Sequence, residues 1–380
     1  MSEGAMNTRS QWGEAPWPRG AEFQDASTPL SKTPDIAIVG GGLTGTSTAL
    51  HLARRGIQCV VYEAGLIADG ASGRTGGLVL EGTAAGILEE VDACVPGLAR
   101  LVAAEGIDCD LALPGCWEIA HRKVAPEKML PWNDGGRPLC VAKTVAGGVV
   151  QPAALTMGLA RAALRAGAEI RQHARVTKIS LAPQLTLEVA GERITPGHLV
   201  IATNAWINAT MPDAAPLESC LTFAVATEAL DAATLKAIGL ERGIPFYTVD
   251  LPYLWGRTML DGGVIFGAGL VFGRPNELED AADVREGESL AVLERMKRRV
   301  RAFHPSLAAV EFSAAWGGPI AFADDSRPLL GAHPRHPRVL VSGGYAGHGV
   351  ALSVRAGELL ALAIAENRPL PDWGNLARFK

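Results

Sequence analysis

The hydrophobic pattern predicts a strand, a helix and a second strand in quick succession between residues 35 and 64. Residues 35–39 (DIAIV) form a short apolar run that ends at glycines, which is typical of a buried parallel strand. Residues 43–55 then repeat apolar side chains on one helical stripe, and Gly56 follows at the expected end of that helix. The stretch IQCVVYEA supplies the second buried strand. We therefore expect a βαβ crossover, the unit that joins neighbouring parallel strands.

Further along the chain, helix-like and strand-like patterns alternate in blocks. Residues 151–170 are patterned as a helix that leads into a strand, and residues 175–206 as a small antiparallel meander that returns to a buried strand. The stretches between these blocks are dominated by strand-like runs and close with a charged amphipathic helix near residues 286–303. The layout predicts an extended arm and two interleaved domains. These are the arm at 1–34, a nucleotide-binding domain from 35–90, 150–215 and 319–380, and a sheet-rich substrate-binding domain from 91–149 and 216–318.

Composition narrows the class of protein without naming an activity. The 380 residues are 48% hydrophobic and 20% charged, as in a soluble globular protein of one large or two ordinary domains. A net charge of -5 disfavours nucleic acid as a partner, and no apolar run reaches the length of a membrane span. The first residues lack the apolar stretch of a signal peptide, so we expect a cytoplasmic protein. The six cysteines show neither a CxxC pair nor metal-ligand spacing, so we expect reduced thiols and no metal.

The first glycine cluster carries a nucleotide-binding signature. Gly40, Gly42 and Gly45 satisfy G-x-G-x-x-G, in which the glycines allow a tight turn, a close approach by a pyrophosphate and close helix–strand packing. Glu63 ends the next strand, where an acid accepts hydrogen bonds from ribose hydroxyls. An ordinary strand–helix turn is the alternative for the glycines alone, but the order of strand, glycines, helix, strand and acid favours dinucleotide binding. Glu63 suits NAD and FAD alike.

Three further stretches, together with residues 35–64, carry a family resemblance. They are GASGRTGGL at 70–78, HLVIATNAW at 198–206 and GGYAGHGVAL at 343–352. In this order and spacing the chain resembles the FAD-dependent amine oxidoreductases of the D-amino-acid oxidase superfamily, which includes sarcosine oxidase and glycine oxidase. It is most similar to the gamma-glutamylputrescine oxidase branch, whose members share the ASGR-x-GG loop and a Trp-containing N-terminal arm. The resemblance implies an α/β fold, α+β overall, in which a glutathione-reductase-like FAD-binding domain with a parallel sheet is interleaved with a sheet-rich substrate domain.

The resemblance assigns a use to each glycine-rich stretch. The first would hold the FAD pyrophosphate and the second would cross the inner edge of the flavin. The last would place a helix N-terminus at the pyrimidine end of the flavin ring, where reduced flavin is negatively charged. Members with covalent flavin use a cysteine in the C-terminal third, whereas the last cysteine here is Cys220, so we expect noncovalent FAD. The implied cofactor-binding residues are Gly40, Gly42, Leu43, Thr44, Gly45, Glu63, Ala64, Ser72, Arg74, Thr75, Gly76, Gly77, Leu78, Val176, Thr203, Asn204, Trp206, Gly317, Gly344, Tyr345, Gly347, His348, Gly349 and Val350.

Amine oxidation by a flavin requires little of the protein beyond orientation, so no acid–base pair is expected. The resemblance places the substrate on the flavin face opposite the ASGRTGG loop, against the sheet-rich domain. The candidate catalytic residues are Tyr253, Trp255 and Arg257 on that sheet, with Trp316 nearby, and His348 beside the flavin. Each has a structural alternative, because aromatic residues on strands are often core and a histidine often binds backbone.

Three positions depart from the family pattern. Sarcosine oxidases carry a substrate-binding lysine where this chain has Ala351, and glycine oxidases carry an arginine where it has Ile320. The family's oxygen-activating lysine is replaced by Ile265. The carboxylate of an α-amino acid would then need Arg257 or Arg74 as its partner. Sarcosine and glycine are therefore disfavoured as substrates, and the electron acceptor is left open between oxygen and another molecule.

The sequence thus predicts an FAD-dependent amine oxidase or dehydrogenase. It would oxidise the C–N bond of a primary or secondary amine to an imine by hydride transfer to flavin N5, followed by hydrolysis. Two alternatives stay open: an N-methyl- or α-amino-acid oxidase of the sarcosine or glycine oxidase type, and a flavin-bound subunit of a hetero-oligomeric dehydrogenase. An NAD-linked dehydrogenase explains only residues 40–63. The expected partners are a small-molecule amine and an electron acceptor, with no nucleic acid or membrane, and the sequence leaves the oligomeric state open.

Overall fold

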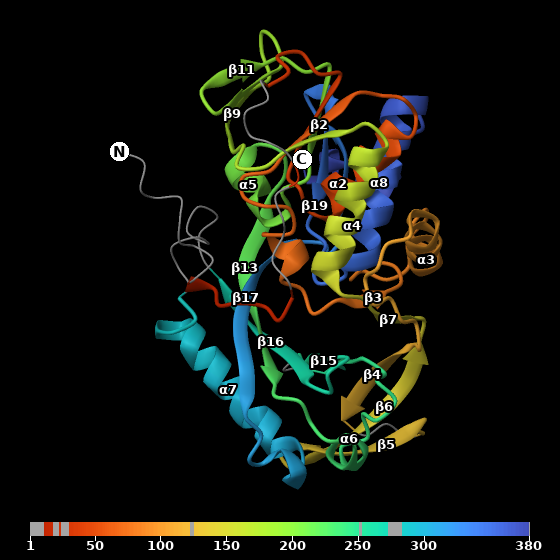
Figure 1. Ribbon diagram of the computed structural model, residues 1–380, viewed down its shortest axis with the longest axis vertical. Coiled ribbons are helices and arrows are strands. Elements are labelled where there is room, and N and C mark those ends of the chain that lie inside the picture. The colour runs from red at the N-terminus through yellow and green to blue at the C-terminus, as the bar shows by residue number, and fades with distance from the viewer. Residues whose placement is uncertain are drawn as a thin grey trace.

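Two large β-sheets organise the molecule. The computed structural model describes residues 11–17, 23, 30–121, 125–250, 253–272 and 283–379. Within these residues, a six-stranded sheet flanked by helices occupies the upper half of Figure 1 and an eight-stranded sheet the lower half. Only a part of the arm expected at residues 1–34 lies inside the described ranges.

The six-stranded sheet is built from strands that lie far apart in the sequence. They are β1 (Ile36–Val39), β2 (Cys59–Tyr62), β8 (Glu169–Arg171), β12 (His198–Ile201), β18 (Leu329–His333) and β19 (His336–Gly343). Their order is β18-β19-β12-β1-β2-β8, and every neighbouring pair is parallel except β18 with β19. The connection from β1 to β2 runs through helix α2 (Leu43–Ala53), so the predicted βαβ crossover is confirmed.

Side chains of the central strand β1 alternate between two hydrophobic cores, one on each face of this sheet. Ile36 and Ile38 pack with helices on one face, and Ala37 and Val39 contribute to the core on the other. The helical side contains α2 and three further helices, which Figure 1 shows grouped together. They are α3 (Cys94–Glu105), α4 (Pro152–Arg165) and α8 (Gly349–Glu366). The other core includes the predicted antiparallel meander, which is formed by β9 (Val176–Ser180), β10 (Thr186–Val189) and β11 (Glu192–Ile194).

Helices α2 and α8 approach closely because small residues meet between them. A Cβ on Gly357 would lie 2.6 Å from the Cβ of Ser47 and 2.7 Å from the carbonyl oxygen of Thr44. The Ser47 hydroxyl donates a hydrogen bond of 2.7 Å to the carbonyl oxygen of Val354. This contact fixes the relative position of the two helices.

The eight-stranded sheet is mostly antiparallel. Its strands are β4 (Cys116–His121), β5 (Lys128–Asp134), β6 (Arg137–Val145), β13 (Leu217–Thr227), β14 (Phe246–Thr248), β15 (Trp255–Thr258), β16 (Val264–Phe272) and β17 (Phe312–Ala323). They are ordered β17-β13-β16-β15-β14-β4-β6-β5, and only β14 and β4 run parallel. Shorter elements complete the described fold: β3 (Leu78–Leu80), β7 (Gly147–Val149), α5 (Ile207–Thr210) and α6 (Ala232–Ala237).

The two faces of the eight-stranded sheet differ in character. Helix α7 (Gly287–Phe303), which confirms the amphipathic helix predicted near 286–303, covers one face. Phe223 and Val225 of β13 share a core with this helix, whereas Ala224 and Ala226 belong to a small separate cluster with Trp316 on the opposite face. That second face turns toward the loop before β3, because the indole N–H of Trp316 donates to the carbonyl oxygen of Arg74 at 2.8 Å.

Three negative expectations concern features of the whole chain. All six cysteines are buried free thiols, and burial raises the pKa of Cys59, Cys116 and Cys220 to about 12. Among the described residues, no cluster of three or more His, Cys, Asp or Glu side chains could bind a metal ion. None of the helices in the described ranges combines the length and hydrophobicity needed to cross a bilayer.

Candidate active site

The turn between β1 and α2 leaves no room for side chains at its three signature glycines. Gly40 has a φ of +107°, and a Cβ there would lie 2.8 Å from the carbonyl oxygen of Ala202. A Cβ on Gly45 would lie 1.9 Å from the carbonyl oxygen of Gly40, and one on Gly42 2.7 Å from the Ser72 hydroxyl. The backbone of this turn is therefore bare on the side that faces Ser72.

Glu63 lies at the end of β2 with its carboxylate against this turn. One oxygen accepts a hydrogen bond of 2.7 Å from the backbone N–H of Gly41, and the other accepts one of 2.8 Å from Gly65. Ala64 follows in the exposed turn between them. Both carboxylate oxygens are thus fixed at the edge of the glycine turn.

Helices α2 and α8 both begin without an acidic side chain in the first turn, and a side chain from another loop bonds to the start of α2. Gly42 precedes α2 and His348 precedes α8; neither caps its helix with its side chain, and neither helix has an acid in its first turn. The hydroxyl of Ser72 accepts from the backbone N–H of Leu43 at 3.0 Å. Two helix N-termini that keep their partial positive charge are suited to anionic groups.

A single tyrosine hydroxyl links these two helix N-termini. Tyr345 is 7% exposed, and its hydroxyl lies 2.6 Å from the Thr44 hydroxyl and 2.9 Å from that of Ser342. Burial raises the pKa of Tyr345 to about 12, so the phenol stays protonated at neutral pH. Asn204, which follows β12, holds the turn before α8, since its side-chain oxygen accepts from the N–H of Gly344 at 2.9 Å.

The loop between β2 and β3 crosses from the first sheet to the second. Its Arg74 donates to the carbonyl oxygens of Gly13 at 3.0 Å and Gly317 at 3.1 Å. The guanidinium also lies 5.5 Å from the ring centroid of Trp12. This side chain therefore binds the segment 11–17 and strand β17, and its predicted place beside the flavin stays a prediction.

Trp255 fills the contact between this loop and the eight-stranded sheet. A Cβ on Gly76 of the loop or on Gly267 of β16 would lie 2.0 Å from the Trp255 ring. Both glycines are needed for the indole to lie flat between loop and sheet. Trp255 thus contacts the ASGRTGG loop directly, and its predicted role as a wall for the substrate stays a prediction.

The sheet register places seven side chains in one row that starts at this contact zone. The row is Trp316, Ala224, Gly267, Trp255, Tyr247, Glu118 and Lys143, on β17, β13, β16, β15, β14, β4 and β6 in turn. Its far end is polar: the Tyr247 hydroxyl donates to Glu118 at 2.6 Å, and Lys143 lies 3.2 Å from the same carboxylate. The near end consists of aromatic and small residues, and the Trp255 ring occupies the position over Gly267.

Arg257 lies in the next row of the same face and is 4% exposed. It donates to the carbonyl oxygens of Val150 at 2.7 Å and Gly76 at 3.4 Å, and within the described chain no carboxylate pairs with it. Burial lowers the pKa of Arg257 to about 10, with Asp110 opposing, so it is a cation at neutral pH. A buried guanidinium that meets only carbonyl oxygens is suited to an anionic ligand.

The sequence that builds this geometry matches a known family. A family model described as FAD dependent oxidoreductase (DAO) matches residues 35–363. The chain belongs to this family. FAD is therefore its cofactor, and the protein is an oxidoreductase.

Curated relatives of the DAO protein span most of both chains. Gamma-glutamylputrescine oxidoreductase of Escherichia coli (strain K12) is 27% identical over 374 residues, covering 87% of this chain and 83% of the relative. Glycine oxidase of Bacillus licheniformis is 24% identical over 393 residues, covering 90% and 96%.

Solved structures confirm the predicted fold class. Glycine oxidase from Geobacillus kaustophilus superimposes with a TM-score of 0.73 at 20% identity, covering 92% of this chain and 99% of that one. L-proline dehydrogenase from P. horikoshii gives 0.72 at 19% identity, covering 92% and 98%. At these identities the likeness concerns the fold alone.

The residues at the two helix N-termini fit FAD. The turn at residues 40–45 offers bare backbone to a pyrophosphate, and the start of α8 offers a second positive end. His348 lies there with its Nδ1 atom buried and, within the described part, without a hydrogen-bond partner. Burial lowers the pKa of His348, so its imidazole is neutral at neutral pH.

The other predicted positions are spread around the same region with different roles. Thr203 contacts the Thr210 hydroxyl at 3.3 Å, and Trp206 stacks on Trp12 with ring centroids 6.2 Å apart. Tyr253 is 41% exposed and does not belong to the row that runs from Trp316 to Lys143. The remaining positions lie in the loop, in strands or at the start of α8: Thr75, Gly77, Leu78, Val176, Gly317, Gly347, Gly349 and Val350.

The sequence did not predict the position of two groups of residues that lie at this face of the eight-stranded sheet. One is the Tyr247–Glu118 pair at the polar end of the row. The other is the segment 11–17, whose Trp17 donates its indole N–H to the carbonyl oxygen of Thr75 at 3.0 Å. Two tryptophans in an aperiodic segment were the available signal for the second group, but their partners lie 58 or more positions along the chain.

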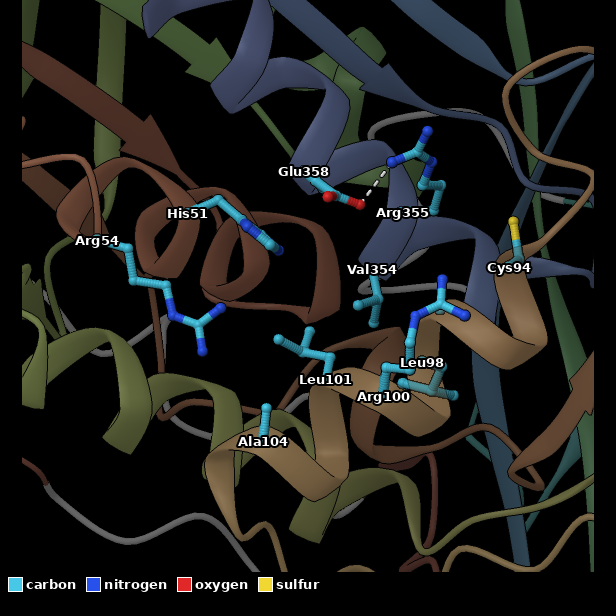
Figure 2. Close-up of a pocket in the computed structure, with 11 residues that line it drawn as sticks. His51, Arg54, Cys94, Leu98, Arg100, Leu101, Ala104, Val354, Arg355 and Glu358 are labelled. Atoms are coloured by element: carbon cyan, nitrogen blue, oxygen red, sulfur yellow. Dashed lines mark hydrogen bonds and ion pairs between the residues drawn. The ribbon is translucent and has the colours of Figure 1, made fainter.

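A separate hollow lies among α2, α3 and α8, near the C-terminal end of α2 (Figure 2). It measures about 240 Å³ and is lined by His51, Arg54, Cys94, Gly97, Leu98, Arg100, Leu101, Ala104, Val354, Arg355 and Glu358. Two of its arginines are paired: Arg54 with Glu105, and Arg355 with Glu358 at 2.6 Å. We assign this hollow no part in the candidate active site.

Proposed function

We propose that this DAO protein oxidises the C–N bond of a primary or secondary amine to an imine. The substrate loses a C–H hydride and an N–H proton, a C=N bond forms, and water then cleaves the imine to a carbonyl compound and an amine or ammonia. Bound FAD supplies the acceptor for the hydride. The observation that carries the proposal is the sheet face opposite Gly76, where Trp255 and Trp316 form an aromatic surface beside the loop.

The residues of this face are suited to orientation rather than to proton transfer. Trp255 is fixed against two glycines and is only partly buried, so the rest of its ring can hold a neutral amine. His348 is neutral and lies at the start of α8, where it can accept or donate one hydrogen bond. Such an environment favours the uncharged amine, which is the form that loses hydride.

An amino acid is the second candidate substrate, and Arg257 is the observation that favours it. Its buried cation without a carboxylate partner can bind a substrate carboxylate in two parallel hydrogen bonds. Ile265 and Ala351 are buried at the positions where related enzymes were expected to carry lysines, so neither supplies a charge.

The deciding experiment is an anaerobic titration of the purified FAD-loaded protein with a panel of amines, followed by its visible spectrum. We expect bleaching by an amine that has no α-carboxylate. Bleaching by α-amino acids such as proline or sarcosine, but by no other amine, would select the second candidate. Readmitted oxygen that restores the spectrum identifies an oxidase, and a spectrum that stays bleached until another acceptor is added identifies a dehydrogenase.

A third outcome concerns the flavin-bound subunit of a larger dehydrogenase. Loaded protein that no amine bleaches, until a partner chain is added, would overturn the proposal of independent turnover.

A further inference from the structure

The segment of residues 11–17 is attached to the eight-stranded sheet by backbone hydrogen bonds. The carbonyl oxygen of Trp12 accepts from the N–H of Gly317 at 2.7 Å, and that of Gln11 accepts from Val284 at 2.7 Å. Gly13 has a φ of +70°, and a Cβ there would lie 2.2 Å from the carbonyl oxygen of Ala315. The segment therefore follows one defined path along β17.

Trp12 anchors this segment. Its side chain is 4% exposed, stacks on Trp206 at an interplanar angle of 24°, and lies beneath the Arg74 guanidinium. A ring buried between an aromatic residue and a cation holds the chain in place on both sides.

Trp17 lies further along the segment and contacts both the loop before β3 and the sheet face that carries Trp316. Its indole N–H donates to the Thr75 carbonyl oxygen at 3.0 Å, and the Arg257 guanidinium lies 5.5 Å from its ring centroid. The side chain also packs against the cluster of Ala224, Ala226, Ile265 and Trp316, on the face of the sheet that turns toward the loop before β3. One indole thus contacts the loop, the buried cation and the sheet face.

We propose that residues 11–17 form a wall of the substrate chamber and that Trp17 is a specificity-determining residue for the anionic end of the substrate. The inference rests on the proposed function and adds to it that the oxidised amine also carries an anionic group, such as a carboxylate, that binds Arg257. The indole ring keeps the guanidinium in place and excludes water from it. A carboxylate at a guanidinium that is shielded from water forms a stronger ion pair than it would in solvent.

The test measures ligand binding without turnover. FAD-loaded protein is titrated with benzoate and with its uncharged isostere benzamide, and the dissociation constants are read from the visible spectrum of the flavin. Trp17→Leu keeps apolar bulk and removes the aromatic rings and the donor, whereas Trp17→Phe keeps a six-membered aromatic ring and removes the N–H donor together with the five-membered ring. Trp373→Leu is the matched control, because Trp373 is also half-buried and donates its indole N–H to a carbonyl oxygen, that of Glu89, at 3.0 Å.

We expect the unaltered protein to bind benzoate at least tenfold more tightly than benzamide. Trp17→Leu should lose this preference, Trp17→Phe should retain part of it, and Trp373→Leu should retain all of it. Equal binding of the two probes by the unaltered protein overturns the proposal, as does an unchanged preference in Trp17→Leu. If Trp17→Leu does not retain FAD, the preference in Trp17→Phe decides, and no reduction there overturns the proposal.

These failures are separable from failure of the proposed function. If amines bleach the flavin but the benzoate preference is unchanged in the Trp17 variants, amine oxidation is supported and this inference is wrong. A benzoate preference that depends on Trp17, in a protein that no amine bleaches, would do the reverse.

Discussion

Tyr345 joins the starts of α2 and α8 through one hydroxyl group, so its removal tests whether that link matters. Tyr345→Phe leaves the hydroxyls of Thr44 and Ser342 without this partner. We expect the free energy of unfolding to fall by about 1–2 kcal/mol, and FAD to dissociate more readily, because the two helix N-termini are less well fixed. Chemical denaturation and flavin release on dilution measure the two effects.

The control for this substitution is a second buried tyrosine. The Tyr62 hydroxyl is buried and, among the described residues, has no hydrogen-bond partner. Tyr62→Phe should therefore leave stability unchanged or raise it. Equal losses in the two variants would show that the Tyr345 link has no special role.

Arg257 gives the second prediction at the scale of single residues. Arg257→Met should raise KM for a substrate with a carboxylate by at least tenfold while changing kcat less, because the lost interaction is made in binding. Arg257→Lys retains a charge without the paired donors and should recover part of the loss. Steady-state kinetics with the amine found to bleach the flavin checks this. A kcat loss without a change in KM would contradict it.

The sequence predicted individual residues well where their reasons are local. Gly40, Gly42 and Gly45 were legible because the turn itself excludes their side chains. The contacts of Arg74 and Trp17 were not predicted, because their partners lie in segments that come together only in the folded chain. Gly317 is such a partner of Arg74. A charge or a ring in a loop carries no record of such a partner.

At the scale of elements, the packing of α2 on α8 depends on one glycine. Gly357→Ala should lower the free energy of unfolding by about 1–3 kcal/mol, because the new methyl group would overlap Ser47 and the backbone of Thr44. Gly97→Ala in α3 is the control, since the nearest atom to its Cβ would be Arg100 Nη2 at 4.0 Å. It should be neutral or stabilise by up to about 1 kcal/mol, through the better helix propensity of alanine. Thermal unfolding of both variants measures the difference.

His51, on the same helix pair, predicts a pH dependence. Burial, the largest cause, lowers its pKa from 6.5 to about 4; Arg54, Arg55 and Arg355 act in the same direction, and Glu358 opposes them. The depressed pKa means that stability is fully present above pH 6.5 and is lost as the pH falls toward about 4. The loss is at most about 3 kcal/mol.

The measurement for His51 is a difference between two pH profiles. Acidic residues also titrate below pH 6.5, so His51→Gln is compared with the unaltered protein by chemical denaturation at each pH. The stability gap between them should change steadily between pH 6.5 and 4, in favour of the variant at low pH. A constant gap would contradict the lowered pKa.

Elements with a clear hydrophobic period were predicted from the sequence, but the pairing of the strands in the eight-stranded sheet was not. The β1–α2–β2 unit followed from an apolar strand, a helical stripe and a glycine stop. The order of the eight-stranded sheet did not, because β14 pairs in parallel with β4 across more than a hundred residues. Pairing at such a separation depends on the whole chain.

For the whole molecule, noncovalent FAD is a prediction with two measurements. Acid precipitation should leave the yellow colour in solution, because the cysteines are buried and the last of them, Cys220, lies within β13. Added FAD should raise the midpoint of thermal unfolding of stripped protein. At a hundredfold excess over Kd the gain is about 2.7 kcal/mol.

Yellow colour that stays with the precipitate would contradict noncovalent binding. A midpoint that does not respond to FAD would mean that the two helix N-termini do not hold the cofactor as a folded unit.

The attachment of residues 11–17 to β17 has a consequence for the order of events during synthesis. Synthesis reaches this segment about 300 residues before its partners Val284 and Gly317. At about 5–20 residues per second, Trp12 and Trp17 wait roughly 15–60 seconds for the surface that buries them. Residues 11–17 thus gain their fixed place on β17 only after most of the eight-stranded sheet has been made, and until then Trp12 and Trp17 lack their partners.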